Sequence, residues 1–162
     1  QEVLFTERGC DQIEFFISTN PGEPLKPLVK VASGGEISRI MLALKSIFSD
    51  QQGVTSIIFD EVDTGVSGRV AQAIAEKIKK VSFNSQVLCI THLPQVAAMA
   101  DHHLFIAKNQ QDDRTQTTVS LLTEKEKTTE IARMISGVEI TPMSLKHANE
   151  LLEFAKKIKA TT

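Results

Sequence analysis

The chain has 162 residues, 41% of them apolar and 23% charged, which suits a single domain with a core and excludes collagen-like, low-complexity and strongly disordered chains. Its 18 Lys and Arg against 20 Asp and Glu argue against a strongly nucleic-acid-binding surface over the whole domain. Two cysteines are too few for a disulfide scaffold, no apolar run approaches the roughly 20 residues of a membrane helix, and no secretory signal opens the chain, so a cytoplasmic location without a membrane partner is expected.

The N-terminal part is predicted to form two short strands around a turn, followed by an extended loop. The strands are expected at Val3 to Thr6 and Ile13 to Ser18, with the turn at Gly9, because apolar and polar side chains mostly alternate in the second run. Prolines at three positions between Asn20 and Pro27 exclude a helix or a central strand there, so this segment is expected to be an extended loop.

The middle of the chain predicts alternating helices and strands. Apolar side chains recur at helical spacing from about Gly35 to Ser49, and again from Val70 to Val81, where Ser67 is a suitable N-cap. Short apolar runs predict buried strands at Val54 to Phe59 and at Gln86 to Ile90. This order predicts an α/β fold whose sheet is mainly parallel and connected by crossover helices.

The remaining elements are predicted to be a short helix, a β-hairpin and two C-terminal helices. A capping box formed by Thr123 and Glu126 marks the start of the first C-terminal helix. The short helix is expected at Pro94–Ala100, and the hairpin strands at His103–Lys108 and Thr115–Leu122 around the loop Asn109–Arg114. The two C-terminal helices are expected from Thr123 to Gly137 and from Thr141 onward.

Polar side chains follow both central strands at the point where each strand ends. Asp60, Glu61 and Asp63 come after the first, and Thr91 and His92 come after the second. Functional groups gather at the carboxyl ends of parallel strands, and carboxylates there can hold a nucleotide-bound Mg²⁺. Adjacent strand residues point to opposite faces, so one acidic residue could serve the metal while the next faces a reacting water. The alternative is that these residues only end a strand and cap the next helix.

A glycine pair precedes the first long helix, in the string Ser33, Gly34, Gly35 and Glu36. Glycines allow close backbone approach, and the N-terminus of a helix offers unpaired N–H groups and a positive dipole end, so this string suits a phosphate. The alternative is a turn before a helix, with Ser33 as the N-cap.

His92 could donate a hydrogen bond to a phosphate or to a metal-bound water, although a single histidine at a strand end is more often structural. No site is assigned to the other histidines, and Cys89 is expected to be a small core residue. A metal-dependent hydrolase built from Asp60, Asp63 and His92 is a further interpretation, without a recognised ligand spacing.

In this order and spacing, the strings resemble the motifs of ATP-binding-cassette ATPases. Residues 32–36 (ASGGE) resemble the signature loop, 57–61 (IIFDE) the Walker B strand with its glutamate, 62–65 (VDTG) the D-loop, and 91–92 (TH) the switch histidine. Within this superfamily, four longer strings resemble the RecN family of bacterial DNA repair proteins, which is similar to SMC proteins. They are NPGEPLKP (20–27), VASGGEISRIMLALK (31–45), FDEVDTGVSG (59–68) and THLPQVAAMAD (91–101).

The resemblance implies that residues 1–162 form the C-terminal lobe of an ATPase head. No G-x-x-x-x-G-K-[ST] string and no long heptad segment occur in the sequence, so the P-loop lobe and the coiled coil are expected outside it. The implied function is ATP hydrolysis, with ATP and Mg²⁺ sandwiched between two heads, in recombinational repair of DNA double-strand breaks. The implied partners are the P-loop lobe and coiled coil of the same protein, a second head, and DNA bound through the complete, nucleoid-associated protein.

The same resemblance implies a role for each candidate residue. Asp60 would order Mg²⁺ through water, Glu61 would act as the general base or position the attacking water, and His92 would contact the γ-phosphate. The loop from Ser33 to Glu36 would contact ATP bound mainly by the opposite protomer, and Asp63 would sit at the dimer interface.

Two further interpretations stay open at this stage. The chain could be the same lobe of a transporter cassette, but Glu36 and the proline-rich loop favour the DNA repair family. It could instead be a non-catalytic dimerisation module, although a structural relic would not need Glu61 and His92. An exposed apolar face and self-association are expected if another lobe normally packs on this one.

Overall fold

The computed structural model describes residues 7, 9–11, 13–18, 21–31, 33–52, 55–111, 114–137 and 139–161. The predicted strand Val3 to Thr6, together with Asn20, Ala32 and Val54, lies outside these described residues. The elements are β1 Phe16–Ile17, β2 Lys26–Pro27, α1 Leu28–Val31, α2 Gly34–Gln52, β3 Ser56–Phe59, α3 Gly68–Val81, β4 Gln86–Cys89, α4 Pro94–Met99, β5 Leu104–Gln111, β6 Arg114–Leu121, α5 Glu124–Ser136 and α6 Pro142–Thr161.

The fold is a mixture of helices and small sheets, as expected for the α/β class. β3 and β4 pair in parallel with Ser56 opposite Gln86 and Phe59 opposite Cys89, and α3 connects them. Among the described residues the expected parallel sheet is present as the β3–β4 pair alone, and β1–β2 and β5–β6 are separate antiparallel pairs. Each of the three described sheets has two strands. The strand–helix–strand unit predicted from the sequence therefore corresponds to β3, α3 and β4 alone.

Several boundaries differ from the predictions at the N-terminal end and in the hairpin. The proline-rich loop contains β2, in which Pro27 lies opposite Phe16 in β1. Pro27 has no N–H to donate, and it is accommodated because it lies in a short two-stranded pair with open edges. The hairpin strands continue through most of the predicted loop, to Gln111 and from Arg114. Helix α1 was not expected at all.

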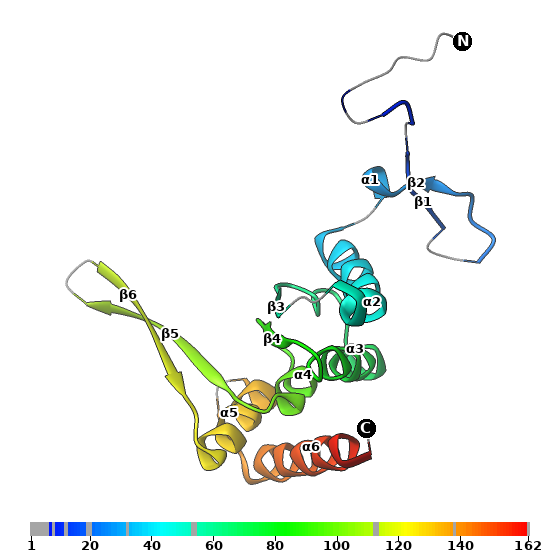
Figure 1. Ribbon diagram of the computed structural model, residues 1–162. Helices are drawn as coiled ribbons and strands as arrows, with labels where there is room; N and C mark the ends of the chain where they lie inside the picture. The colour runs from blue at the N-terminus through cyan, green and yellow to red at the C-terminus, as the bar shows by residue number, and fades with distance from the viewer. Residues whose placement is uncertain are drawn as a thin grey trace.

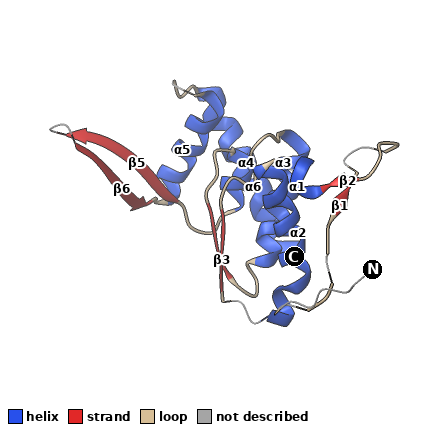
Figure 2. Ribbon diagram, turned by 90° about the horizontal axis from the view of Figure 1, so that it is seen from above, coloured by secondary structure: helices blue, strands red, loops and turns tan. Residues whose placement is uncertain are grey.

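The elements are arranged as a body with two projections (Figure 1). Helices α3, α4, α5 and α6 pack together beside the β3–β4 pair, while the β5–β6 hairpin and the β1–β2 segment extend away from the body in both views (Figures 1 and 2). Val62, Ala71, Ile131, Ala132 and Ala148 have no exposed surface and lie at the centre of this body. The predicted capping box at Thr123 and Glu126 is present, and Gly137 is the C-cap of α5, as expected.

An apolar surface stays open on α2 and on one face of the β3–β4 pair. The helical spacing predicted for α2 is correct, but its apolar stripe faces outward, and Leu42 is its one side chain described as buried. In β3, Ile57 and Phe59 are buried whereas Ile58 is 68% exposed, so the predicted buried strand is buried on one face only. The expectation of an exposed apolar surface is therefore confirmed, and self-association remains a prediction.

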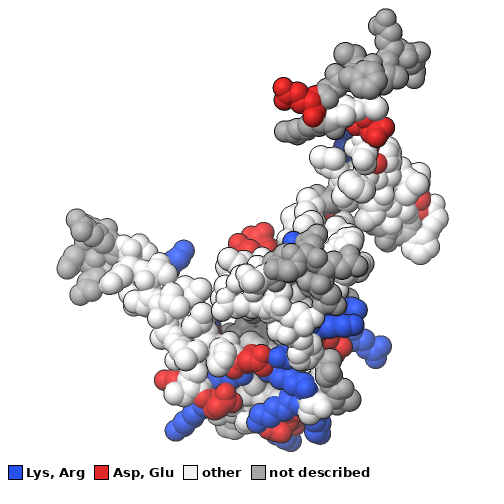
Figure 3. All heavy atoms as spheres, viewed as in Figure 1, with Lys and Arg blue, Asp and Glu red and all other residues white. Residues whose placement is uncertain are grey.

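Charged side chains of both signs mix over the helical body. In the view of Figure 3, Lys and Arg lie among Asp and Glu near α3, α5 and α6, while the hairpin is mostly uncharged. Asp101 pairs there with Lys79 at 2.8 Å and Lys159 at 3.1 Å, and the ammonium of Lys127 donates to the Ala100 carbonyl at 3.0 Å. This cluster ties α3, α5 and α6 to the segment that follows α4.

The half-buried imidazole of His103 predicts a pH-dependent stability. Its Nε2 bonds the Ala97 carbonyl, and burial lowers its pKa, opposed by that bond and assisted by the charges of Lys127 and Lys159. The imidazole of His103 therefore binds a proton more readily in the unfolded chain than in the folded one. The stabilisation that comes from the neutral, folded His103 is complete above the ordinary histidine pKa of about 6.5 and is lost as the pH falls below it.

Denaturant titrations between pH 5 and 7.5 check this prediction. The slope of the unfolding free energy against pH should flatten in His103→Gln, whose amide can still donate to Ala97. His102→Gln, at the exposed neighbour, is the matched control and should keep the slope of the unaltered chain. An unchanged slope in His103→Gln would assign the pH dependence to other groups.

Candidate functional site

The start of α2 is closed by a reciprocal capping box. The N–H of Ser33 donates to Glu36 Oε2 at 2.7 Å, and the N–H of Glu36 donates to Ser33 Oγ at 3.4 Å. The bond from the Ser33 N–H, followed by a bond from the Ser33 side chain, lowers the pKa of Glu36, so its carboxylate is held ionised at the positive end of the helix. Both Ser33 and Glu36 therefore cap the helix, as the alternative interpretation proposed for Ser33. The expected contact of Glu36 with a nucleotide stays a prediction, and its Oε2 accepts the cap bond from the Ser33 N–H.

The two glycines bring α2 against the loop that follows β3. A Cβ atom at Gly35 would lie 2.9 Å from the Thr64 carbonyl oxygen and 3.1 Å from Nη1 of Arg39. A side chain would therefore push the helix away from this loop, and Gly35 is needed for the close approach. A Cβ atom at Gly34 would lie 3.9 Å from Glu61 Oε2, so the Glu61 carboxylate lies beside the start of the helix.

The loop from Asp60 to Thr64 is a tight turn whose residues differ in exposure. Asp60 and Glu61 are exposed, whereas Val62 and Asp63 are buried. Glu61 has φ +57, in the left-handed region that few residues other than glycine adopt, and the N–H of Thr64 donates to the Glu61 carbonyl at 3.1 Å. The strand-like alternation of Asp60 and Glu61 expected from the sequence is therefore interrupted by this turn.

Asp63 joins this loop to the residues that follow β4. Its carboxylate accepts the Thr91 hydroxyl and, at 3.3 Å, the His92 N–H, while His92 Nδ1 lies 3.6 Å from Asp63 Oδ1. Asp63 is 1% exposed, so it does not lie on the surface where a dimer interface was expected. The structure thus assigns it an internal role, and the predicted gathering of the two strand ends is correct.

His92 and Cys89 differ sharply in their surroundings. The His92 side chain is 66% exposed and free to meet a ligand on the side away from Asp63. Burial, together with the charges of Asp63 and Asp60, raises the pKa of Cys89 to about 12. Cys89 is therefore a neutral thiol at neutral pH, and it is partly buried against the core rather than inside it as predicted.

The described residues contain no group of three or more His, Cys, Asp or Glu side chains that could hold a metal ion. The interpretation as a hydrolase with Asp60, Asp63 and His92 as metal ligands is therefore wrong, since Asp63 is directed inward to Thr91 and His92. Asp60 is an exposed carboxylate, which fits a Mg²⁺ ion held mostly by water and phosphate oxygens.

Within the described residues, no helix is long and apolar enough to cross a membrane.

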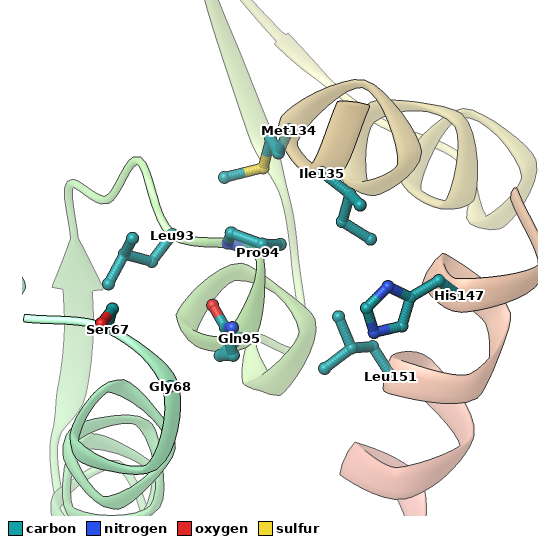
Figure 4. A pocket seen from close by; sticks show the side chains of 9 residues that line it. All are labelled: Ser67, Gly68, Leu93, Pro94, Gln95, Met134, Ile135, His147 and Leu151. Carbon is teal, nitrogen blue, oxygen red and sulfur yellow. The ribbon is translucent and has the colours of Figure 1, made fainter. Parts of the chain in front are cut away.

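A pocket of about 260 Å³ lies between the starts of α3 and α4 and the facing sides of α5 and α6 (Figure 4). Leu93 and Gln95 line it on one side and His147 on the other. None of the residues predicted for the site lines this pocket. The sequence-predicted residues instead gather around the loop from Asp60 to Asp63.

The sequence interpretation missed two residues of α2 that hold this loop. The Ser38 hydroxyl donates to the Asp60 carbonyl at 3.3 Å, and Nη1 of Arg39 donates to the Thr64 carbonyl at 2.9 Å. Arg39 lies one helical turn after Gly35, and this spacing is the signal that could have placed it beside the glycine.

Comparison with known proteins gives a consistent set of relatives. No family model matches the chain. It is 69% identical over 161 residues to the DNA repair protein RecN of Bacillus subtilis strain 168, covering 99% of this chain and 28% of the relative. RecN of Halalkalibacterium halodurans is 68% identical, with 96% and 27% covered, and RecN of Vibrio cholerae is 45% identical, with 89% and 26% covered.

One solved structure is similar to this chain, with a TM-score of 0.49 and 25% sequence identity. It comes from work on the structural biochemistry of ATP-driven dimerization and DNA-stimulated activation of SMC ATPases, and the match covers 76% of this chain and 81% of the other. The overlap is too loose to support the site by itself. The chain spans about 28% of the length of the first curated relative that it matches. Over nearly all of its own length, this chain is similar in sequence to one part of the bacterial RecN proteins.

Proposed function

We propose that this chain is the C-terminal lobe of an SMC-like ATPase head in a DNA repair protein, and that two such heads hydrolyse ATP sandwiched between them. The observation that carries the proposal is the junction at the end of β3. There the Glu61 carboxylate lies beside Gly34, and the buried Asp63 holds Thr91 and His92. The identity to RecN proteins supports a function in DNA repair, with DNA bound through the complete protein.

The residues fit one side of a Mg²⁺–ATP site. Asp60 and Glu61 are exposed at the end of a parallel strand, and His92 is exposed next to Asp63 of the same loop. Bound Mg²⁺–ATP supplies the phosphoryl group and the metal charge that polarises it. Glu61 would orient a water for attack and accept its proton, Asp60 would bind waters of the metal shell, and His92 would donate a hydrogen bond to a phosphate oxygen.

The start of α2 would face the nucleotide of the opposite head. Ser33 Oγ accepts the Glu36 N–H, and the Ser33 hydroxyl also bonds the Glu36 carboxylate, so it would turn away from that carboxylate to donate to an anion. The Ser33 N–H is already bonded to Glu36, so the backbone contribution would come from Gly34 and the residues after it. The open apolar faces of α2 and of the β3–β4 pair offer area for a P-loop lobe, which supports a two-lobed head.

The 162-residue chain by itself is expected to bind ATP weakly, with a Kd in the millimolar range or above. Its sequence has no P-loop string to cradle the β- and γ-phosphates, and the lysine of that motif is missing with it. Isothermal titration of the chain, and of a full-length protein that carries it, measures the difference. The full-length protein should bind ATP tightly and form dimers with ATP in light scattering.

Tight, stoichiometric ATP binding by the 162 residues would contradict this prediction. A full-length protein that dimerises without hydrolysing ATP would favour the alternative of a non-catalytic dimerisation module. The exposed positions of Glu61 and His92 speak for catalysis, since a purely structural module gains nothing from leaving them accessible.

A further inference from the structure

The backbone at Glu61 adopts a conformation that needs support from its surroundings. The backbone angle φ of +57 at Glu61 is sterically unfavourable for a residue with a side chain. Residues adopt such a conformation where contacts with their neighbours hold the backbone in it. Glu61 itself is exposed, so its side chain is not what holds the turn. The support has to come from the residues on either side of it.

Helix α2 supplies that support at both ends of the turn. Before Glu61, the Asp60 carbonyl accepts the Ser38 hydroxyl at 3.3 Å, and after it the Thr64 carbonyl accepts Nη1 of Arg39 at 2.9 Å. The N–H of the same Thr64 donates to the Glu61 carbonyl at 3.1 Å, so a shift of Thr64 is passed directly to Glu61. The guanidinium bond is the shorter of the two contacts and is charge-assisted.

The absence of a side chain at Gly35 makes room for this contact. A Cβ atom there would lie 3.1 Å from Nη1 of Arg39 and 2.9 Å from the Thr64 carbonyl oxygen, the two atoms that bond each other. Nη1 of Arg39 therefore passes beside a glycine backbone that belongs to the candidate phosphate loop. The same helix end that carries Ser33 and Gly34 thus also holds the turn that carries Glu61.

We propose that Arg39 is a positioning residue that ties Glu61 to the signature loop of its own head. The inference rests on the proposed function, and deepens it by coupling two ATP sites: Glu61 would serve the nucleotide bound by its own head, and Ser33 to Gly35 the nucleotide of the opposite head. A movement of α2 on engaging the second nucleotide is passed through Arg39 and Thr64 to the base. Arg39 does not touch the reacting atoms, and acts through the turn.

The test uses a full-length protein that carries this segment, with the variants Arg39→Ala and Arg39→Lys. Arg69→Ala is the matched control, because Arg69 is an exposed arginine in the first turn of α3. Hydrogen exchange of the nucleotide-free protein should speed up over residues 60–65 in Arg39→Ala and not in Arg69→Ala. This measurement does not depend on ATP hydrolysis.

The second measurement separates kcat from ATP affinity. In Arg39→Ala, kcat should fall about 10- to 100-fold, the loss that a misplacement of about 1 Å can cause, with unchanged ATP affinity and melting temperature. Arg39→Lys should recover part of kcat, since an ammonium can donate to the Thr64 carbonyl, whereas a merely structural defect would lower affinity and melting temperature together.

If hydrogen exchange over residues 60–65 were unchanged in Arg39→Ala, Arg39 would not hold the turn. If hydrogen exchange were faster but kcat stayed normal, Arg39 would hold the turn without positioning Glu61 for catalysis. Failure of the proposed function looks different. In that case, Glu61→Gln would itself leave the hydrolysis rate of the full-length protein unchanged.

Discussion

Replacement of Glu61 by glutamine is expected to lower the rate of ATP hydrolysis about 100- to 10,000-fold in a full-length protein that carries this segment. Glutamine keeps the size and the hydrogen-bonding reach of the side chain but cannot accept a proton from water. ATP binding should survive, because the exposed Glu61 carboxylate holds no other part of the fold among the described residues. The variant should therefore accumulate as an ATP-bound dimer.

Steady-state hydrolysis and light scattering with ATP measure these two effects together. Glu76→Gln is a suitable control, because Glu76 is an exposed glutamate on α3 whose contact with Gln72 a glutamine can replace. It should hydrolyse ATP at the normal rate and release its dimers. If Glu61→Gln instead hydrolysed ATP normally and remained monomeric with ATP, another residue would be the base.

The elements that the sequence predicted well are those whose signals are local. The helical spacing within α3, the capping box of α5 and the proline at the start of α4 each depend on residues within one or two turns of each other. Ser67 occupies the N-cap position of α3 as expected, although its side chain makes no capping bond. Spacing thus located the helix but could not show how its end is satisfied.

The parts that the sequence could not predict depend on contacts between distant segments. The predicted end of the strand at Phe59 is correct, but the expectation that Asp60 and Glu61 point to opposite faces as in a strand did not include the turn that Ser38 and Arg39 hold directly after Phe59. The apolar stripe of α2 was recognised correctly, but periodicity cannot say whether a partner covers the stripe. Within this chain, most of that stripe remains exposed.

The candidate site followed the same division. The sequence indicated which residue types gather at the strand ends, and the parallel pairing of β3 and β4 brings those ends together. It could not show that Asp63 faces inward, because two acidic residues in one loop look alike in the sequence. Burial separates them, since Asp63 is 1% exposed whereas Asp60 is open to solvent.

This difference in burial predicts a large difference in the stability effects of substituting Asp63 and Asp60. Asp63→Ala should lower the free energy of unfolding by about 2–4 kcal/mol, because it removes a buried carboxylate acceptor and leaves the Thr91 hydroxyl and the His92 N–H without their partner. Asp60→Ala, three residues earlier in the same loop, should change it by less than about 0.5 kcal/mol, because that side chain is exposed. Urea titrations of the 162-residue chain measure both values.

A catalytic consequence follows from the same contacts and separates Asp63 from a purely structural residue. Asp63→Asn keeps the volume and one acceptor, so it should retain most of the stability while altering the group that faces His92 Nδ1, 3.6 Å away. In a full-length protein, Asp63→Asn should lower kcat while the melting temperature changes little, since the His92 ring loses its charged neighbour. Equal stability losses in Asp63→Ala and Asp60→Ala would contradict the inward role, whereas normal kcat in Asp63→Asn would restrict Asp63 to holding the fold.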